Sequence, residues 1–441
     1  MDRLPTIPRL EVLKNRKEIL KNPLPFHQKY FRKYGDTFRI DLGGKNNWVF
    51  TRNPWAVRHI LQKNHKNYHK SALQTRDLAK YVGHGLLTTN GEPWRVHRRI
   101  IQPAFHKEKL EGLLDIMHST ITTELGGIVP NEVQDIFPLM GDLAFQVVAQ
   151  SLFSTDDIRE RMQRLKQITE ENQKMLIKEM RLPYLKWWFQ WSGEIKRHLR
   201  LSEEARELLN GIVQERVNLD KERDDLLYML ITARYEDGTP MSRRQLLDEV
   251  MILFTAGHET TANALSFALW LLALHPKMQK RLYMEVRGID FNKGDIMPVL
   301  GQLSFTRQCV EEAMRLYPPA YFMDRVSLDE DVIGDHTFKK GTIWLMSLYE
   351  LHRHPHFWER PNEFIPQRFD LKNKKDFSDY YFPFGAGPRM CVGNNFALYE
   401  MMMVLALVVQ KYELASIAEI QVNPLITLKP RSAMLTFTER D

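Results

Sequence analysis

Residues 384–393 read Phe-Gly-Ala-Gly-Pro-Arg-Met-Cys-Val-Gly and place Cys391 in a glycine-rich turn, with Arg389 two residues before it. An apolar run from 396 to 409 follows, which predicts a helix beginning shortly after the cysteine. A sulfur at the start of a helix lies near free backbone N–H groups and the positive end of the helix dipole, so the thiolate is expected to be favoured. A thiolate can bind a metal or attack an electrophile, and the turn alone leaves both roles open.

The composition fits a globular protein with a large core, because 43% of the 441 residues are hydrophobic and 27% are charged. Cys309 is the only cysteine besides Cys391, which excludes a disulfide framework and favours a reducing compartment, so we expect a cytoplasmic protein. No run approaches the roughly 20 apolar residues that span a bilayer, and the N-terminus lacks the apolar core of a signal peptide. We therefore expect no transmembrane segment.

The net charge of +7, from 62 basic and 55 acidic residues, is too small to indicate a nucleic-acid-binding protein. The basic residues are interleaved with acidic ones and form no nucleic-acid-binding motif, so no nucleic acid is expected as a partner. A moderately basic face also suits an acidic protein partner.

Helical periodicity dominates the chain and predicts long helices at 108–126, 134–153, 157–180, 201–219 and 242–274. Strand-like alternation is confined to short segments at 37–42, 48–51, 332–333, 343–346, 425–430 and 434–438. We predict a mainly α protein with a minor β region that joins the two ends of the chain, in a single domain over residues 1–441. An irregular stretch from about 350 to 395 leads to Cys391, and so long a loop indicates a functional role or a wrapped ligand.

The longest apolar helix is interrupted by Ala-Gly-His-Glu-Thr-Thr at residues 256–261. Threonine hydroxyls can bond to the carbonyl four residues earlier and open a polar notch, in which Glu259 and Thr260 could relay protons. A locally satisfied polar face is the alternative. The pair His258-Glu259 suggests a zinc protease, but residue 262 is alanine rather than the second histidine, so this interpretation fails.

Two further pairs are weak signals when taken alone. Glu312 and Arg315 lie three residues apart and share a helix face, as many surface ion pairs do. Trp94 and Arg98 also share a face, and the indole and guanidinium groups are both donors suited to a carboxylate. An exposed basic helix turn explains the second pair equally well.

Taken together and in this order, these elements resemble the cytochrome P450 family of haem-thiolate enzymes. The turn at 384–393 matches the haem-binding loop, and 256–261 matches the oxygen-activation stretch of the central helix. Glu312 and Arg315 match the Glu-x-x-Arg pair, which Arg368 in Pro-Gln-Arg-Phe completes as a triad. The resemblance covers roughly residues 25–440 and implies a triangular, mostly helical fold with one haem b.

The resemblance also implies roles for single residues. Cys391 is implied to be the axial thiolate ligand of the haem iron, and Phe384 the aromatic that packs beside the sulfur. The haem propionates are implied to be held by Arg389, Arg98, Arg325 and Trp94. The catalytic pair is implied to be Thr260 and Glu259, which would deliver protons to activated oxygen, while Glu312, Arg315 and Arg368 would hold the long loop.

An acid–alcohol pair favours a monooxygenase that activates O2 over a peroxide-driven peroxygenase or a haem-thiolate sensor without turnover. The chain has no room for a fused flavin reductase, so electrons from NAD(P)H are expected to arrive through a ferredoxin or flavodoxin with its reductase. The acidic surface of such a carrier would meet a basic face around Cys391. We expect a monomer. The histidine-rich stretch at 352–356 matches an ordinary structural segment of the family rather than a second metal site.

The substrate is a small molecule whose identity the motifs leave open. Family-matched contact regions are 74–87, parts of 165–190, Ala256, Ala320 and Phe322, while Asp324 is expected to face the propionate shell. The aromatic segment 184–191 has three open interpretations: it inserts into a membrane, stacks on a sugar or other ring, or packs in the core. The overall look is similar to bacterial family members that oxidatively demethylate 6-O-methyl-galactose and release formaldehyde. Hydroxylation of a fatty acid or terpene is the alternative.

Overall fold

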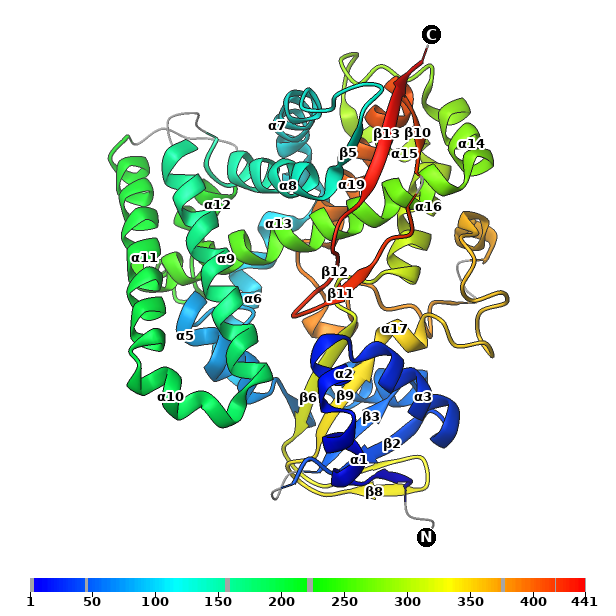
Figure 1. Ribbon diagram of the computed structural model, residues 1–441. Coiled ribbons are helices and arrows are strands. Elements are labelled where there is room, and N and C mark those ends of the chain that lie inside the picture. Colours follow the sequence, from blue (N-terminus) through cyan, green and yellow to red (C-terminus); the bar gives the residue numbers. More distant parts are fainter. Residues whose placement is uncertain are drawn as a thin grey trace.

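The computed structural model describes residues 4–43, 47–154, 159–219, 225–373, 377–416 and 418–440, and it is mostly helical (Figure 1). The long periodic stretches form the expected helices, with α11 starting earlier than predicted: α7 Lys107–Leu125, α8 Ile136–Phe153, α9 Arg159–Arg181, α11 Glu194–Leu219 and α13 Arg243–Leu274. Helices of intermediate length are α3 Leu24–Tyr34, α6 Gly91–Ile101, α14 Pro276–Val286, α16 Ser304–Leu316 and α19 Asn394–Lys411. Shorter ones are α1 Arg9–Lys14, α2 Arg16–Lys21, α4 Pro54–Arg58, α5 Ala79–Val82, α10 Lys186–Trp191, α12 Leu226–Thr232, α15 Ile296–Gln302 and α17 Leu348–Leu351.

Helix α13 runs through the centre of the molecule and packs against α8, α11, α16 and α19 (Figure 1). It begins where the Ser242 hydroxyl accepts a hydrogen bond from the backbone N–H of Gln245, and Pro276 just beyond its end starts α14. Most of its side chains are buried on all sides, as expected of a helix that crosses a core. This rigid element carries the predicted catalytic pair.

Helix α8 is, by length and composition alone, apolar enough to cross a membrane, and it is the one such helix in the described ranges. The same is true of many core helices, and 61% of its apolar window is buried inside the protein. It packs mainly against α7 and α13, and α12 also contacts it. We therefore interpret α8 as a core helix.

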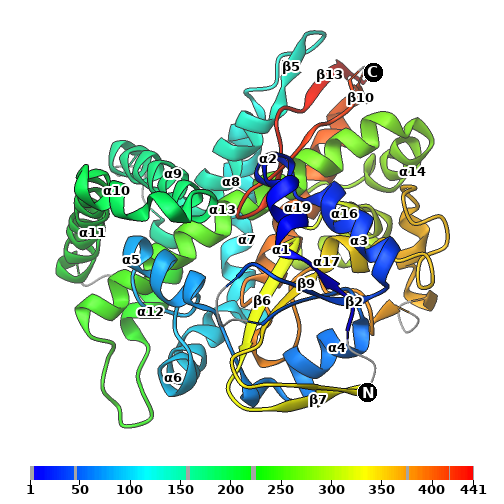
Figure 2. The ribbon, with the colours of Figure 1, turned by 60° about the horizontal axis from the view of Figure 1, so that its bottom comes forward.

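A six-stranded sheet forms the β-rich corner, where β2, β9 and β6 can be seen in Figure 2. The strand order in this sheet is β1-β2-β3-β9-β6-β4. Their bounds are β1 Thr6–Ile7, β2 Thr37–Ile40, β3 Trp48–Thr51, β9 Ile343–Ser347, β6 Phe322–Ser327 and β4 Tyr68–His69. Smaller sheets comprise β10 Tyr412–Ala415 with β13 Met434–Glu439 and β5 Val133–Asp135, β11 Val422–Pro424 with β12 Leu428–Pro430, and β7 Asp331–Ile333 with β8 His336–Phe338.

The mainly α fold with a minor β region is confirmed, but the predicted β region joining the two chain ends is wrong. The N-terminal strands β2 and β3 extend into β9 and β6 instead, through the parallel pairing of β3 with β9. The C-terminal strand β13 pairs with β10 and β5 in a separate sheet. Alternating patterns locate strands but do not identify their partners, which long-range packing selects.

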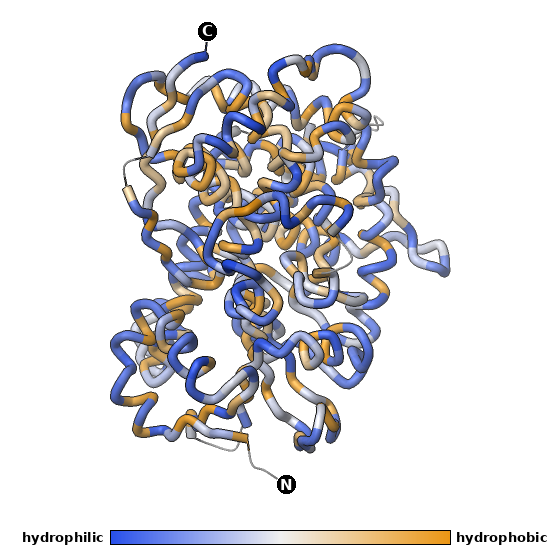
Figure 3. Tube along the Cα trace, turned by 90° about the vertical axis from the view of Figure 1, so that its right-hand side faces the viewer, coloured by the Kyte–Doolittle hydropathy of each residue, from blue (hydrophilic) through white to orange (hydrophobic). Residues whose placement is uncertain are grey.

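The largest hydrophobic cluster lies among α7, α8, α13 and α19, whereas two smaller clusters back the β-rich corner. Hydrophilic residues follow the outer loops of the trace, and hydrophobic ones recur along the inner helices (Figure 3). From His352 to Gly393 the described residues form only short helical turns, in line with the predicted long loop. This loop ends at Cys391, close to the start of α19.

Candidate functional site

The cysteine turn is shaped by its backbone. The Cys391 N–H donates to the carbonyl of Phe384 at 2.9 Å, which closes the turn in front of α19. Gly387 has φ +70°, and a Cβ there would lie 2.0 Å from the carbonyl oxygen of Leu61. Only glycine fits so close an approach. The turn leaves Cys391 exposed, in contrast to the buried Cys309.

The protonation prediction for Cys391 requires a correction. Although the residue as a whole is exposed, loss of hydration around its sulfur raises the pKa of the Cys391 thiol, while the Gly393 N–H and the charge of Arg98 lower it in part. The predicted helix-terminus effect is present, but loss of hydration outweighs it. The protein alone therefore does not favour the thiolate, and a bound metal cation would have to do so.

The predicted polar notch lies in the middle of α13. The Thr260 hydroxyl donates to the Ala256 carbonyl at 2.9 Å, and the Thr261 hydroxyl donates to the Gly257 carbonyl at 3.0 Å. Ala256 is exposed although most of α13 is buried, so the helix borders open space at this turn. The Thr260 hydroxyl lies at this turn, and Glu259 is the preceding residue.

Glu259 points toward the turn between β11 and β12. Its Oε1 accepts a hydrogen bond from the Thr427 hydroxyl at 2.7 Å and lies 3.5 Å from Lys429 Nζ. Thr427 in turn accepts from the Asn263 amide at 3.1 Å. The ammonium of Lys429 is partly exposed, so this polar chain extends from α13 to the surface.

Histidines near these residues do not form a metal site. His258 is buried beside Phe145, and its Nδ1 pairs with the Phe254 carbonyl at 2.9 Å, away from Glu259. His354 pairs with Asp36 at 2.9 Å. Within the described ranges, no group of three histidine, cysteine, aspartate or glutamate side chains is arranged to hold a metal ion.

Cationic side chains gather beside the cysteine turn. The guanidinium of Arg389 lies 4.8 Å from the Trp94 ring centroid, and its buried Nε has no hydrogen-bond partner. Burial, and then the charge of Arg325, lower the pKa of Arg389 to about 10. Arg325 is itself buried, and burial lowers its pKa despite the neighbouring carboxylate of Asp324. Burying several positive charges together costs free energy of folding unless an anion neutralises them.

Lys70 belongs to this cluster and was missed by sequence reasoning. Its Nζ donates to the carbonyls of Leu86 at 2.6 Å and Thr89 at 3.2 Å. Burial, followed by the charges of Arg389 and Arg325, lowers its pKa to about 6. No motif marks Lys70, and only the pairing of β4 with β6 brings it beside Arg325. Strand pairing of this kind is not visible in a single sequence.

Arg98 and Asp324 occupy positions near those expected. Arg98 donates to the carbonyl of Met390 at 2.7 Å, directly beside Cys391. Asp324 is buried, and its Oδ1 accepts from the Gln74 amide at 2.7 Å, which ties the 74–87 region to β6. Phe384 is half-buried and packs against the main core.

The Glu312–Arg315 pair is fully buried and bidentate. Arg315 Nε and Nη2 donate to the two Glu312 oxygens at 2.7 and 2.8 Å. Arg315 also donates to the carbonyls of His352, Pro361 and Glu363, all in the long loop. Arg368 completes the triad at 3.3 Å from Glu312.

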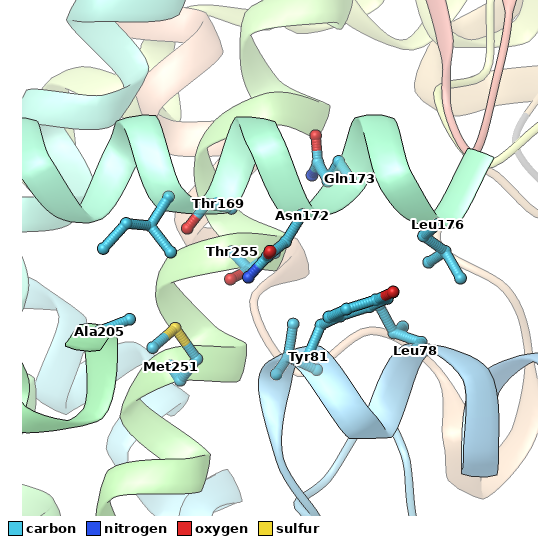
Figure 4. Close-up of a pocket in the computed structure, with 11 residues that line it drawn as sticks. Leu78, Tyr81, Thr169, Asn172, Gln173, Leu176, Ala205, Met251 and Thr255 are labelled. Atoms are coloured by element: carbon cyan, nitrogen blue, oxygen red, sulfur yellow. The ribbon is translucent and has the colours of Figure 1, made fainter. Parts of the chain in front are cut away.

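The two expected substrate-contact regions meet over α13 (Figure 4). A cavity of ≈ 20 Å³, about enough for one water, lies between the 74–87 region, α9 and α13. Its lining is mostly apolar: Leu78, Tyr81, Val82, Ile168, Thr169, Asn172, Gln173, Leu176, Ala205, Met251 and Thr255. Phe322 instead contacts His27 and Phe50 in the β-rich corner, and Ala320 is exposed.

A basic depression of ≈ 370 Å³ opens beside the cysteine turn. It is lined by His65, Lys66, His69, Gly91, Trp94, Arg95, Arg98, Arg99, Gln102, Pro388 and Arg389. No acidic residue contributes to this lining, although Glu92 pairs with Arg95 and Glu236 with Arg99 at its edge. The expected basic face around Cys391 is therefore present.

The fold and the cysteine turn define a haem-thiolate protein, and comparison with known proteins agrees. The family described as Cytochrome P450 matches residues 4–437, so the chain belongs to the cytochrome P450 family. It is 29% identical over 391 residues to cyclooctat-9-en-7-ol 5-monooxygenase of Streptomyces melanosporofaciens, covering 86% of this chain and 83% of that one. It is 28% identical over 462 residues to chloroplastic cytochrome P450 97B2 of Glycine max, covering 90% and 79%.

Solved structures show the same fold. The haem domain of cytochrome P450DA superposes with a TM-score of 0.85 at 24% identity, covering 100% of this chain and 98% of that one. CYP102L1 superposes with a TM-score of 0.82 at 22% identity, covering 95% of each chain. The protein is a monooxygenase that uses haem b, with electrons supplied from NAD(P)H through a partner.

Proposed function

We propose that Cys391 would bind the haem iron through its sulfur and that the cationic cluster would hold the two haem carboxylates. The cluster comprises Arg389, Arg98, Arg325 and Trp94, as predicted, together with Lys70. Three observations support the fit: an unpaired buried Nε on Arg389, a lowered pKa on the buried Lys70, and an exposed cysteine. Phe384 would pack beside the sulfur. When bound, haem supplies the reductive activation of O2, which a thiolate ligand assists by donating electron density.

We also propose that Glu259 and Thr260 supply protons from solvent to the reaction. The side chains of Lys429, Thr427 and Glu259 form a polar chain from the surface to the notch in α13. Thr260, the residue after Glu259, carries its hydroxyl at that notch. This acid–alcohol pair is the observation that carries the O2-dependent function. A peroxygenase or a sensor would have no use for such a chain.

The cavity favours an apolar substrate. Its lining is mostly apolar, and several of its polar side chains are already committed: the Tyr81 hydroxyl donates to Glu179 and the Thr169 hydroxyl to the Leu165 carbonyl. Among the described residues, the Thr255 hydroxyl is buried without a partner. The Asn172 side chain pairs with both Ser202 and His198. A methyl sugar would bring several hydroxyls and find few partners here. We therefore propose hydroxylation of an apolar molecule such as a fatty acid or terpene, with sugar O-demethylation as the less supported candidate.

A spin-state titration against fatty acids, terpenes and methyl sugars tests this choice. An apolar ligand that displaces the iron-bound water is expected to shift the Soret band toward high spin, whereas methyl sugars leave it unchanged. Because the cavity is small, α9 must move away from α13 before a substrate can bind. The spectral shift should therefore develop slowly after mixing. A shift given only by 6-O-methyl-galactose, with release of formaldehyde on turnover, would reverse the assignment.

We propose that a ferredoxin or flavodoxin docks at the basic depression beside Cys391. Its basic lining, which includes the exposed Lys66, provides the positive charge that an acidic carrier requires. Reduction by such a carrier is expected to slow at least several-fold between low and physiological salt, because screening weakens steering. Stopped-flow reduction at several salt concentrations measures this, and a rate independent of salt would count against the site. A monomeric state, a single domain and a cytoplasmic location stay predictions.

A further inference from the structure

The segment from Met180 to Arg200 exposes an unusual set of apolar side chains. It includes α10, which bridges the adjacent ends of α9 and α11 (Figures 1 and 2). Its exposed large apolar residues are Met180, Tyr184, Trp187, Trp188, Trp191 and Leu199, and we call this set with its basic neighbours the aromatic–basic patch. So concentrated an exposed surface indicates an interaction site.

Folding does not account for the tryptophans. Of the α10 aromatics, only Phe189 is buried, at 4% exposure, whereas Trp187 is 64% and Trp191 is 76% exposed. The tryptophan rings contact one another instead, with centroids 5.9 Å apart for Trp187–Trp188 and 5.1 Å for Trp188–Trp191. Of the three interpretations that the sequence left open for this segment, the core interpretation holds for Phe189 alone.

The same segment is strongly basic. Its basic residues are Arg181, Lys186, Lys196, Arg197 and Arg200, against the single acidic residue Glu194. Lys178 pairs with that carboxylate and so neutralises it. Lys196 and Arg200 are exposed and form no ion pair with any carboxylate in the described part of the chain. A free positive charge therefore accompanies the tryptophans.

We propose that the aromatic–basic patch docks on the surface of an anionic lipid bilayer. Tryptophan and tyrosine favour the membrane–water interface, and each lysine or arginine near an anionic surface contributes about 1 kcal/mol. A second copy of this chain would carry the same positive charge and would be repelled, which argues against a dimer contact here. A neutral sugar would gain no attraction from the positive charge. The docking is peripheral, and it stands apart from the proposed function.

The aromatic–basic patch and the adjacent end of α9 are connected by ion pairs and hydrogen bonds to the 74–87 region, which lines the cavity. Lys186 within it pairs with Asp77 at 3.2 Å. Near the end of α9 and adjacent to Met180, Glu179 accepts hydrogen bonds from Lys80 at 2.6 Å and from Tyr81. Docking would thus place the segment that covers the cavity at the lipid surface, where apolar molecules accumulate.

Vesicle flotation of the haem-loaded protein tests the proposal, with vesicles of phosphatidylcholine alone or mixed with phosphatidylglycerol. The wild-type protein is expected to float only with the anionic vesicles. The double variant Lys196→Gln/Arg200→Gln should bind roughly thirty-fold more weakly, as two charges at 1 kcal/mol each imply. Trp187→Gln/Trp191→Gln should weaken binding roughly tenfold or more.

Matched controls separate the patch from general effects. Trp55 is 59% exposed in the β-rich corner, and Trp55→Gln should bind as wild type. Lys107 and Lys109 are exposed at the start of α7, and Lys107→Gln/Lys109→Gln should also be unchanged. An unaltered Soret spectrum shows that each variant is folded. Equal loss in controls and patch variants, flotation with neutral vesicles alone, or tryptophan-dependent dimerisation without vesicle binding would overturn the proposal.

Discussion

Arg315→Ala is expected to lower the free energy of unfolding by about 3–5 kcal/mol, because it leaves the Glu312 carboxylate buried without its partner. The loss is not confined to one pair. The carbonyls of His352, Pro361 and Glu363 also lose their donor, so the long loop that leads to Cys391 loses its attachment to α16. Haem should therefore be released at a lower denaturant concentration than in wild type.

Denaturant unfolding followed by circular dichroism and by the Soret band measures both effects. Arg307→Ala is the matched control on the same helix, since Arg307 pairs with Glu311 at 3.2 Å but is 43% exposed. An exposed pair of this kind contributes at most about 1 kcal/mol. Should Arg315→Ala yield no folded protein, Arg315→Lys keeps the charge and loses the bidentate geometry. Equal destabilisation by Arg307→Ala and Arg315→Ala would contradict the assigned role.

Thr260→Ala is expected to lower the product formed per NAD(P)H consumed by roughly tenfold or more, because it removes the hydroxyl from the proposed proton path. Consumption of NAD(P)H should continue, since no group in the electron-transfer face is changed. The ratio of product to NAD(P)H oxidised, measured with a substrate found by titration, reports this coupling. Stability should change little, because the Thr260 hydroxyl bonds only within its own helix.

Thr261→Ala supplies the control for this variant. Thr261 makes the same kind of bond, to the Gly257 carbonyl at 3.0 Å, but its side chain is buried. It should therefore leave the coupling ratio unchanged. If both variants couple as wild type does, Thr260 has no part in proton delivery.

The long helices could be predicted because their apolar periodicity is a local property, and all five predicted stretches are helical in the described residues. Strand partners could not, since the pairing of β3 with β9 joins segments about 300 residues apart in the chain. For the same reason, the place of Lys70 in the cationic cluster could not be predicted, because only the pairing of β4 with β6 brings it there.

Local reasoning also misjudged electrostatics at the centre of the site. The position of Cys391 before α19 suggested a stabilised thiolate, but loss of hydration in the folded protein raises the pKa of the thiol. Glu259 is a similar case, because its partners Thr427 and Lys429 belong to a hairpin near the C-terminus. The motifs pointed to candidate residues, whereas the surroundings that affect the protonation of those residues come from the tertiary fold.

The Soret band of the reduced protein under carbon monoxide tests most directly whether Cys391 binds the haem iron as a thiolate. A strongly red-shifted band is expected for wild type and for Cys309→Ser, because Cys309 is buried within the main core. Cys391→Ser should lose that shift. A wild-type band at the position typical of a histidine-ligated haem, or a red-shifted band retained in Cys391→Ser, would contradict the thiolate assignment.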